Sequence, residues 1–60
     1  MSDTKVRTES EARNFFLRNH KDSVTCVGDD GAEYLADSYP EAVAFLGGER
    51  DPDALALAGE

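Results

Sequence analysis

A chain of 60 residues is too short for two domains, and its single cysteine excludes an intramolecular disulfide. One cysteine and one histidine also exclude the usual structural zinc sites, which take four such ligands. No apolar run approaches the ~20 residues that span a bilayer, and the polar N-terminus is unlike a signal peptide. We therefore expect a single small domain over residues 1–60, located in the cytoplasm, with no membrane partner.

The charges are distributed unevenly along the chain, whose formal net charge is −7. Residues 1–21 hold five bases and three acids, which gives +2. Residues 22–60 hold ten acids and one base, Arg50, which gives −9, and the two parts together make −7. A region with this much negative charge repels nucleic acid and attracts basic surfaces. We therefore expect no direct nucleic-acid binding.

The first 21 residues predict one helix after a frayed start at residues 1–7. The segment Thr8-Glu9-Ser10-Glu11 has the pattern of a capping box, with threonine at the N-cap and glutamate three residues later. Ala12, Phe15 and Phe16 follow at spacings that place them on one face of a helix. The pattern predicts an amphipathic helix over about residues 9–20.

The middle of the chain predicts a β-hairpin. Residues 23–27 are rich in β-branched side chains, the Asp29-Asp30-Gly31 segment favours a tight turn, and residues 32–36 return as a second strand. A two-residue loop would pair Val27 with Tyr34, whereas a three-residue loop with a bulge would pair Cys26 with Tyr34. A slip of one residue exchanges the two faces, so either Tyr34 or Leu35 is the buried residue.

The last third predicts a second helix and a short third one. Residues 38–41 form a second capping-box pattern, and Gly47-Gly48 ends the helix that follows. Asp51-Pro52 resembles an N-cap followed by proline at the first helical position, which opens either a short third helix or a frayed tail. Residues 59–60 are expected to be frayed. The predicted fold class is α+β, a small α-β-β-α domain in which two helices pack one antiparallel hairpin.

No catalytic or metal-binding motif is evident. His20 and Cys26 are the only plausible base and thiol, and a helix-terminal histidine with a small buried cysteine explains them more simply. If Gly31 took the glycine position of an EF-hand loop, Cys26 and Gly28 would occupy ligand positions, which does not suit calcium. We predict a protein that is not an enzyme and that needs no metal or cofactor.

Two features of the sequence suggest a binding surface. Acidic residues extend from the turn to the start of the second helix, and such a row of charge could imitate a phosphate backbone or simply maintain solubility. The second helix is apolar almost all round, so Tyr39 and Phe45 are either core residues or exposed interface anchors. The predicted partner-binding residues are Asp29, Asp30, Glu33, Asp37, Glu41, Tyr39 and Phe45.

In size, acidity and single-domain build, with its GDDGAEYLAD hairpin and acidic tail GERDPDALALAGE, the chain resembles small phage-encoded anti-CRISPR inhibitors. The resemblance is one of type over the whole chain and transfers no residue role. It implies a stoichiometric inhibitor in the host cytoplasm, whose acidic surface blocks the DNA-binding surface of a CRISPR effector subunit.

The leading hypothesis is therefore a non-enzymatic inhibitor or binding protein of the DNA-mimic type, which docks on a basic nucleic-acid-binding site of a partner protein. The alternative is a small self-associating module, such as an antitoxin-like homodimer held by its apolar helix. In that case the acidity serves solubility, as in a salt-loving archaeon.

Overall fold

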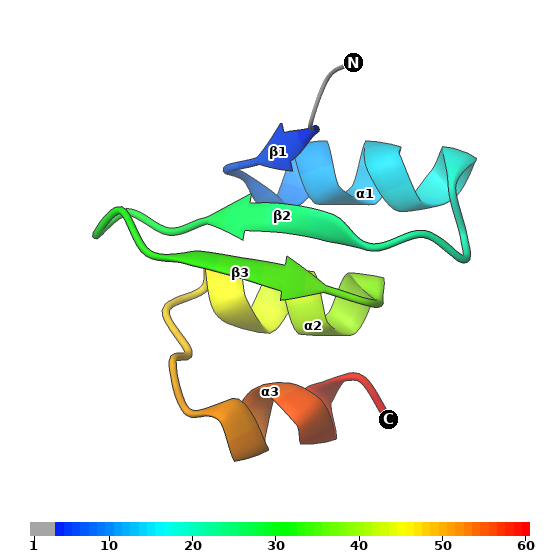
Figure 1. Ribbon diagram of the computed structural model, residues 1–60. Coiled ribbons are helices and arrows are strands. Elements are labelled where there is room, and N and C mark those ends of the chain that lie inside the picture. Colours follow the sequence, from blue (N-terminus) through cyan, green and yellow to red (C-terminus); the bar gives the residue numbers. More distant parts are fainter. Residues whose placement is uncertain (1–3) are drawn as a thin grey trace.

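Three strands and three helices form along residues 4–60, the part of the chain that the computed structural model describes (Figure 1). The elements are β1 (Lys5–Val6), α1 (Glu9–Arg18), β2 (Val24–Val27), β3 (Glu33–Ala36), α2 (Tyr39–Leu46) and α3 (Pro52–Ala58). The sheet order is β1-β2-β3, with β1 parallel and β3 antiparallel to the central strand. The predicted α+β class is confirmed, and the third helix forms.

Strand β1 corrects the prediction that residues 1–7 are frayed. Lys5 and Val6 pair with Thr25 and Cys26 of β2, and the Val6 side chain is only 2% exposed. Residues 1–3 lie outside the described part of the chain. The hairpin is therefore extended to a three-stranded mixed sheet, which has more hydrophobic surface to bury than a two-stranded hairpin.

The hairpin adopts the register of the three-residue loop, with Cys26 opposite Tyr34. The Gly28 amide donates to the Ala32 carbonyl at 2.8 Å, and Gly31 completes the turn at a φ of 86°, a conformation that glycine adopts without strain. This register places Cys26 and Ala36 on the inner face of the sheet, with Tyr34 partly buried beside them. Leu35 lies on the outer face and is 59% exposed.

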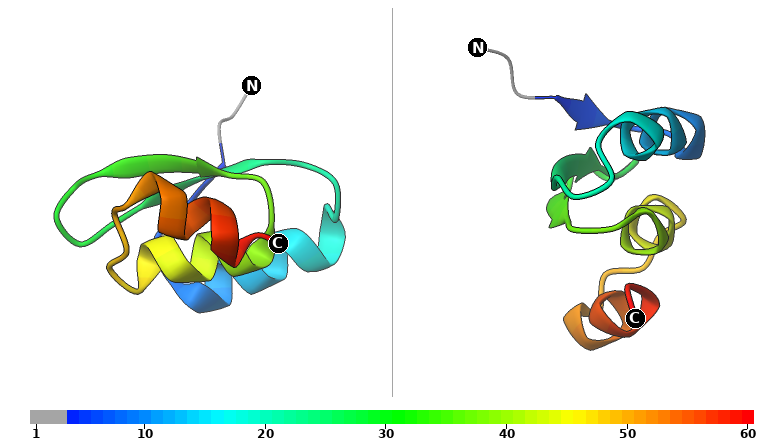
Figure 2. Two further views of the ribbon diagram at one scale, coloured as in Figure 1. Left: turned by 90° about the horizontal axis from the view of Figure 1, so that it is seen from below. Right: turned by 90° about the vertical axis from the view of Figure 1, so that its right-hand side faces the viewer.

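The helices lie on one face of the sheet (Figure 2). Helices α1 and α2 pack against the strands and against each other, whereas α3 packs on α2 alone. The three helices therefore form a row in which α1 and α3 are the outer members (Figures 1 and 2).

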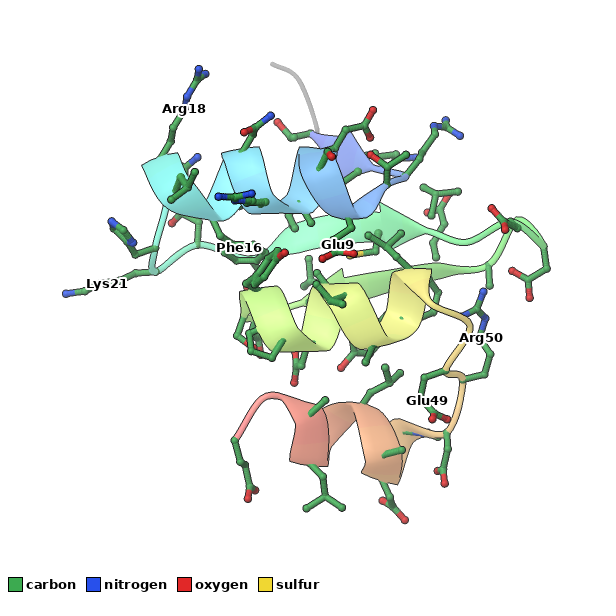
Figure 3. All side chains as sticks on the ribbon, turned by 180° about the vertical axis from the view of Figure 1, so that it is seen from behind. Glu9, Phe16, Arg18, Lys21, Glu49 and Arg50 are labelled. Atoms are coloured by element: carbon green, nitrogen blue, oxygen red, sulfur yellow. The ribbon has the colours of Figure 1, made fainter. Side chains whose placement is uncertain are left out.

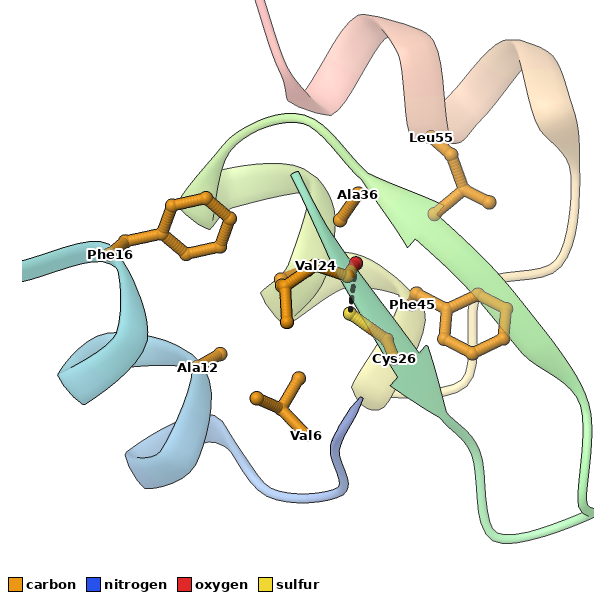
Figure 4. Packing of buried hydrophobic residues seen from close by; sticks show 9 residues of the cluster. Val6, Ala12, Phe16, Val24, Cys26, Ala36, Phe45 and Leu55 are labelled. Atoms are coloured by element: carbon orange, nitrogen blue, oxygen red, sulfur yellow. Dashed lines mark hydrogen bonds between the residues drawn. The ribbon is translucent and has the colours of Figure 1, made fainter. Parts of the chain in front are cut away.

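The core between sheet and helices is built largely from small side chains (Figure 4). Alanines on α1, β3 and α2 are fully buried, and this lets the helices approach the sheet closely. Leu55 is the one buried side chain of α3, so it holds that helix to the rest of the domain. The buried residues are Val6, Ala12, Phe16, Val24, Cys26, Ala36, Ala42, Phe45 and Leu55.

The helix starts follow the predicted capping signals, with one correction. At α1 the Thr8 hydroxyl accepts from the Glu11 amide at 3.2 Å, and the Glu11 carboxylate accepts from the Arg7 amide at 2.7 Å. At α2 the Glu41 carboxylate accepts from the Asp37 amide at 2.8 Å, but the Ser38 hydroxyl makes no capping bond. The second capping box is therefore only half formed.

Helix α1 ends at Arg18, two residues before the predicted limit. Both the backbone amide and the side-chain amide of Asn19 donate to the Phe15 carbonyl, at 2.9 and 3.1 Å, and this closes the last turn. Lys21 and His20 consequently belong to the loop that leads to β2.

We expect Val6→Ala to lower the free energy of unfolding by about 2 kcal/mol, because it removes two buried methyl groups and leaves a cavity. That loss is large for a chain of this length, since stability scales as ~0.05–0.15 kcal/mol per residue. Urea denaturation followed by circular dichroism measures it. The neighbouring variant Lys5→Ala, at an exposed position, should change the midpoint little. Equal midpoints for Val6→Ala and the wild type would show that β1 is not part of the fold.

Candidate functional site

The structure does not gather the predicted acidic residues into one row. Asp29 and Asp30 lie at the hairpin turn, and Glu33 lies on β3, where its carboxylate pairs with Lys5 at 3.5 Å. Asp37 and Glu41 lie beyond the other end of β3, at the start of α2. The acids therefore fall into separate groups with different surroundings.

The hairpin turn meets the loop between α2 and α3. Asp29 and Asp30 line a shallow pocket together with Arg50 and the glycines that end α2. Glu49 and Asp51 flank Arg50 in the same loop. Four exposed carboxylates from two segments about twenty residues apart thus come together, and we call Asp29, Asp30, Glu49 and Asp51 the acidic end.

Arg50 holds the acidic end together (Figure 3). Its guanidinium forms a two-pronged contact with the Asp30 carboxylate, at 2.9 and 3.3 Å. The remaining nitrogen donates to the carbonyl oxygens of Phe45 and Glu49, at 2.7 and 2.8 Å. The guanidinium also stacks over the Phe45 ring, 4.0 Å from its centroid. Arg50 therefore fixes the hairpin turn to the core and to the end of α2.

Gly28 is needed for this arrangement. A Cβ atom added at Gly28 would overlap the Arg50 guanidinium. The close approach of the guanidinium to the hairpin backbone is thus a reason for glycine at this position.

The electrostatics of the acidic end leave most of its charge unpaired. The hydrogen bond from Arg50, together with that from the Ala32 amide, lowers the pKa of Asp30 below its ordinary value. Within residues 4–60, no base forms an ion pair with Asp29, Glu49 or Asp51. The Glu49 carboxylate accepts from the amides of Arg50 and Asp51, and Asp51 caps α3. The four acids and Arg50 carry a formal charge of −3.

The other predicted acids have structural roles. The Asp37 carboxylate accepts from the Ser23 hydroxyl at 2.7 Å, and Glu41 accepts from the Asp37 amide. Glu41 is also half-buried. These carboxylates join the start of α2 to the ends of the strands, and they lie at the opposite end of β3 from Asp29 and Asp30.

Phe45 is a core residue and not an exposed anchor. It is 3% exposed and stacks on Tyr34, with the ring centroids 5.3 Å apart. Tyr39 is half-buried; it donates to Glu9 at 3.1 Å and lies edge-on to Phe16. Burial and the Glu9 carboxylate raise the pKa of the Tyr39 hydroxyl. Neither aromatic residue presents a free face beside the acidic end.

Cys26 and His20 do not form a catalytic arrangement. The Cys26 side chain is fully buried, and burial, followed by the charge of Glu41, raises the pKa of its thiol. Its sulfur lies 4.0 Å from the Val24 carbonyl oxygen (Figure 4). His20 is exposed in the loop after α1. A buried thiol with a raised pKa is a poor nucleophile.

Across residues 4–60, no three histidine, cysteine, aspartate or glutamate side chains are grouped so that they could hold a metal ion. None of the helices described is long and apolar enough to cross a membrane.

No protein-family model, curated protein or solved structure matches this chain. The importance of the acidic end therefore rests on its own geometry and charge. The resemblance to anti-CRISPR inhibitors stays a prediction.

The central role of Arg50 was not predicted from the sequence. The one feature of the sequence that pointed to Arg50 was its charge, because it is the only base among residues 22–60. A lone base among many acids is a candidate to be held by one of them. The choice of Asp30 as its partner, twenty residues away, depends on the fold.

Arg50→Ala should make stability less sensitive to acid. The pKa of Asp30 is lowered in the folded state, so its ionised form stabilises the fold above the unfolded pKa of about 3.9. This contribution is lost as the pH falls through the folded pKa. Without Arg50, part of the loss of stability between about pH 5 and pH 2 should disappear from urea midpoints.

The Asp30→Asn variant tests the same contact from the other side. It should remove the part of the acid profile that Arg50→Ala removes together with the part due to the Ala32 amide, and adding Arg50→Ala to it should change the profile no further. A profile for Arg50→Ala that runs parallel to that of the wild type would contradict this assignment.

The Cys26 thiol should react with a thiol reagent such as Ellman's reagent only when the fold opens. We expect reaction in the native state to be slower than in denaturant by about the ratio of folded to unfolded molecules, a factor of 100 or more. Absorbance at neutral pH follows the reaction. His20→Ala should leave the native rate unchanged, whereas a slower rate in that variant would mean that His20 activates the thiol.

Proposed function

We propose that the chain is a non-enzymatic binding protein whose acidic end docks on a basic, nucleic-acid-binding surface of a partner protein. The observation that carries this proposal is the convergence of the hairpin turn and the α2–α3 loop, which Arg50 ties together. It concentrates four exposed carboxylates at one place and leaves three of them without an ion pair in the described structure.

The attachment of the acidic end to the core favours binding. Loops that must become ordered on binding lose conformational entropy, and this loss weakens the complex. Here Arg50 links both segments to the buried Phe45, and Asp51 caps α3. The carboxylates are therefore presented by segments that are already ordered, so that less entropy is lost when they meet a partner.

The charge of the acidic end favours a surface built for phosphate groups. Such surfaces carry lysine and arginine side chains that neutralise a nucleic-acid backbone. Exposed carboxylates offer the same charge to these side chains, and complementary charge speeds association and sets orientation. A DNA-binding surface of a CRISPR effector subunit, which the resemblance implies, belongs to this class.

The remaining predicted contacts have smaller roles in this proposal. Glu33 has Lys5 as a partner, and Asp37 and Glu41 accept hydrogen bonds that organise the start of α2. They add to the long-range field that steers a basic partner. Because Phe45 is buried and Tyr39 is bound to Glu9, binding relies on charge and should weaken as salt increases.

Reversing charge at the acidic end should weaken capture of basic proteins by about tenfold. The test variant Asp29→Lys/Glu49→Gln raises the net charge by three and keeps a hydrogen-bond acceptor at position 49. The matched control Asp22→Lys/Glu9→Gln makes the same change in net charge away from the acidic end. Pull-downs from a host lysate at about 50 mM and about 500 mM salt compare the two.

We expect the wild type and the control to retain the same basic proteins at low salt. An excess of duplex DNA should displace these proteins from both. The test variant should lose them while its circular dichroism stays that of the folded chain. Equal capture by both variants would show that the acidity serves solubility.

A further inference from the structure

Two exposed leucines lie on the outer helices of the helix row. Leu17 of α1 is 63% exposed and Leu57 of α3 is 68% exposed. Helix α2 separates α1 from α3 and packs against both (Figures 1 and 2). Each outer helix therefore has one face that is not covered by another helix of the same molecule.

The residues around the two leucines follow the same spacing with opposite charge. Positions i, i+3, i+4 and i+7 lie on one face of a helix. In α1 these positions hold Arg13, Phe16 and Leu17, and His20 in the loop after the helix lines the same groove; we call these four residues the basic stripe. In α3 and the residues after it, the same positions hold the acidic stripe: Asp53, Ala56, Leu57 and Glu60.

The basic stripe lines a groove. Its four residues form one wall, and Ser38 and Tyr39 at the start of α2 form the other. Phe16 is 7% exposed and packs edge-on against Tyr39, so the inner part of the groove is aromatic. Among the described side chains, neither Arg13 nor His20 forms an ion pair with a carboxylate.

The acidic stripe faces away from the molecule. All four of its residues are exposed, whereas Leu55 on the other side of α3 is buried against the rest of the domain. Ala56 is small, so the backbone of α3 can approach an opposing surface closely beside Leu57.

We propose that the acidic stripe of one copy of this chain docks along the basic stripe of a second copy. Leu57 packs beside Leu17 in the groove, and Ala56 provides room for Phe16. Asp53 and Glu60 then lie near Arg13 and His20, which have the same separation along the sequence. One copy then keeps its basic stripe free and the other keeps its acidic stripe free, so the contact is head-to-tail and can be repeated.

The matching spacing and opposite charge favour a second copy as the occupant. A symmetric contact between two α1 faces or two α3 faces would bring like charges together, which disfavours it. The net charge of −7 on each copy opposes association, so we expect a weak contact with a Kd near ~1 mM. The acidic end takes no part, so this inference does not depend on the proposed function.

The experiment uses one variant for each stripe. Leu17→Glu disables the basic stripe and leaves the acidic one intact, whereas Leu57→Lys does the reverse. Both leucines are exposed, so both variants should fold. Sedimentation equilibrium at concentrations up to about 1 mM, near the expected Kd, measures the weight-average mass of each variant, of their equimolar mixture and of the wild type.

The wild-type mass should rise with concentration, and each variant alone should stay monomeric. Their mixture should form a dimer and nothing larger, because only one functional stripe of each kind remains. The matched control Leu35→Lys changes the third exposed leucine, on the sheet, and should associate like the wild type.

Several results would overturn the inference. A monomeric wild type or a monomeric mixture would show that the two stripes do not bind each other. A single variant that still dimerises would indicate a symmetric contact. Loss of association in Leu35→Lys would place the contact on the outer face of the sheet.

Discussion

The acidic end depends on the contacts of the Arg50 guanidinium. This group joins Asp30 of the hairpin turn to the carbonyl oxygen and the ring of Phe45, which is itself buried against Tyr34. It is also the only base of residues 22–60. Because Arg50 is engaged by Asp30 in the contact that fixes the hairpin turn, it does not pair with the neighbouring carboxylates. Those carboxylates remain exposed and without an ion pair in the described structure.

The small core explains why the outer helix faces remain open. Alanines and Cys26 let α1 and α2 lie close to the sheet, but they bury little apolar area. A chain of this length buries only about 60% of the surface that its unfolded form exposes. Once the sheet face and α2 are covered, no described element remains to cover Leu17 or Leu57. Both leucines consequently stay at the surface, Leu17 beside basic residues and Leu57 beside acidic ones.

Local signals predicted most of the fold. The capping residues, the Asp-Gly turn and the Gly47-Gly48 stop located the helices and the hairpin, because each acts within a few residues. The register stayed open because both loop lengths suit the turn sequence. Strand β1 was missed because Lys5 and Val6 are too few to show a period, and their pairing with β2 is set by the fold. The contact between Arg50 and Asp30 was not predicted either, because the fold brings these two residues together.

The two proposed contacts affect each other because their surfaces adjoin. Asp51 belongs to the acidic end and caps α3, and Asp53 begins the acidic stripe two residues later. A basic partner that covers both residues would prevent α3 from docking in the groove of a second copy. Partner binding and self-association would then be mutually exclusive at this helix, since one acidic segment cannot occupy two basic surfaces at once. A partner confined to the hairpin turn and Glu49 would leave α3 free, so the size of the partner decides whether the two contacts compete.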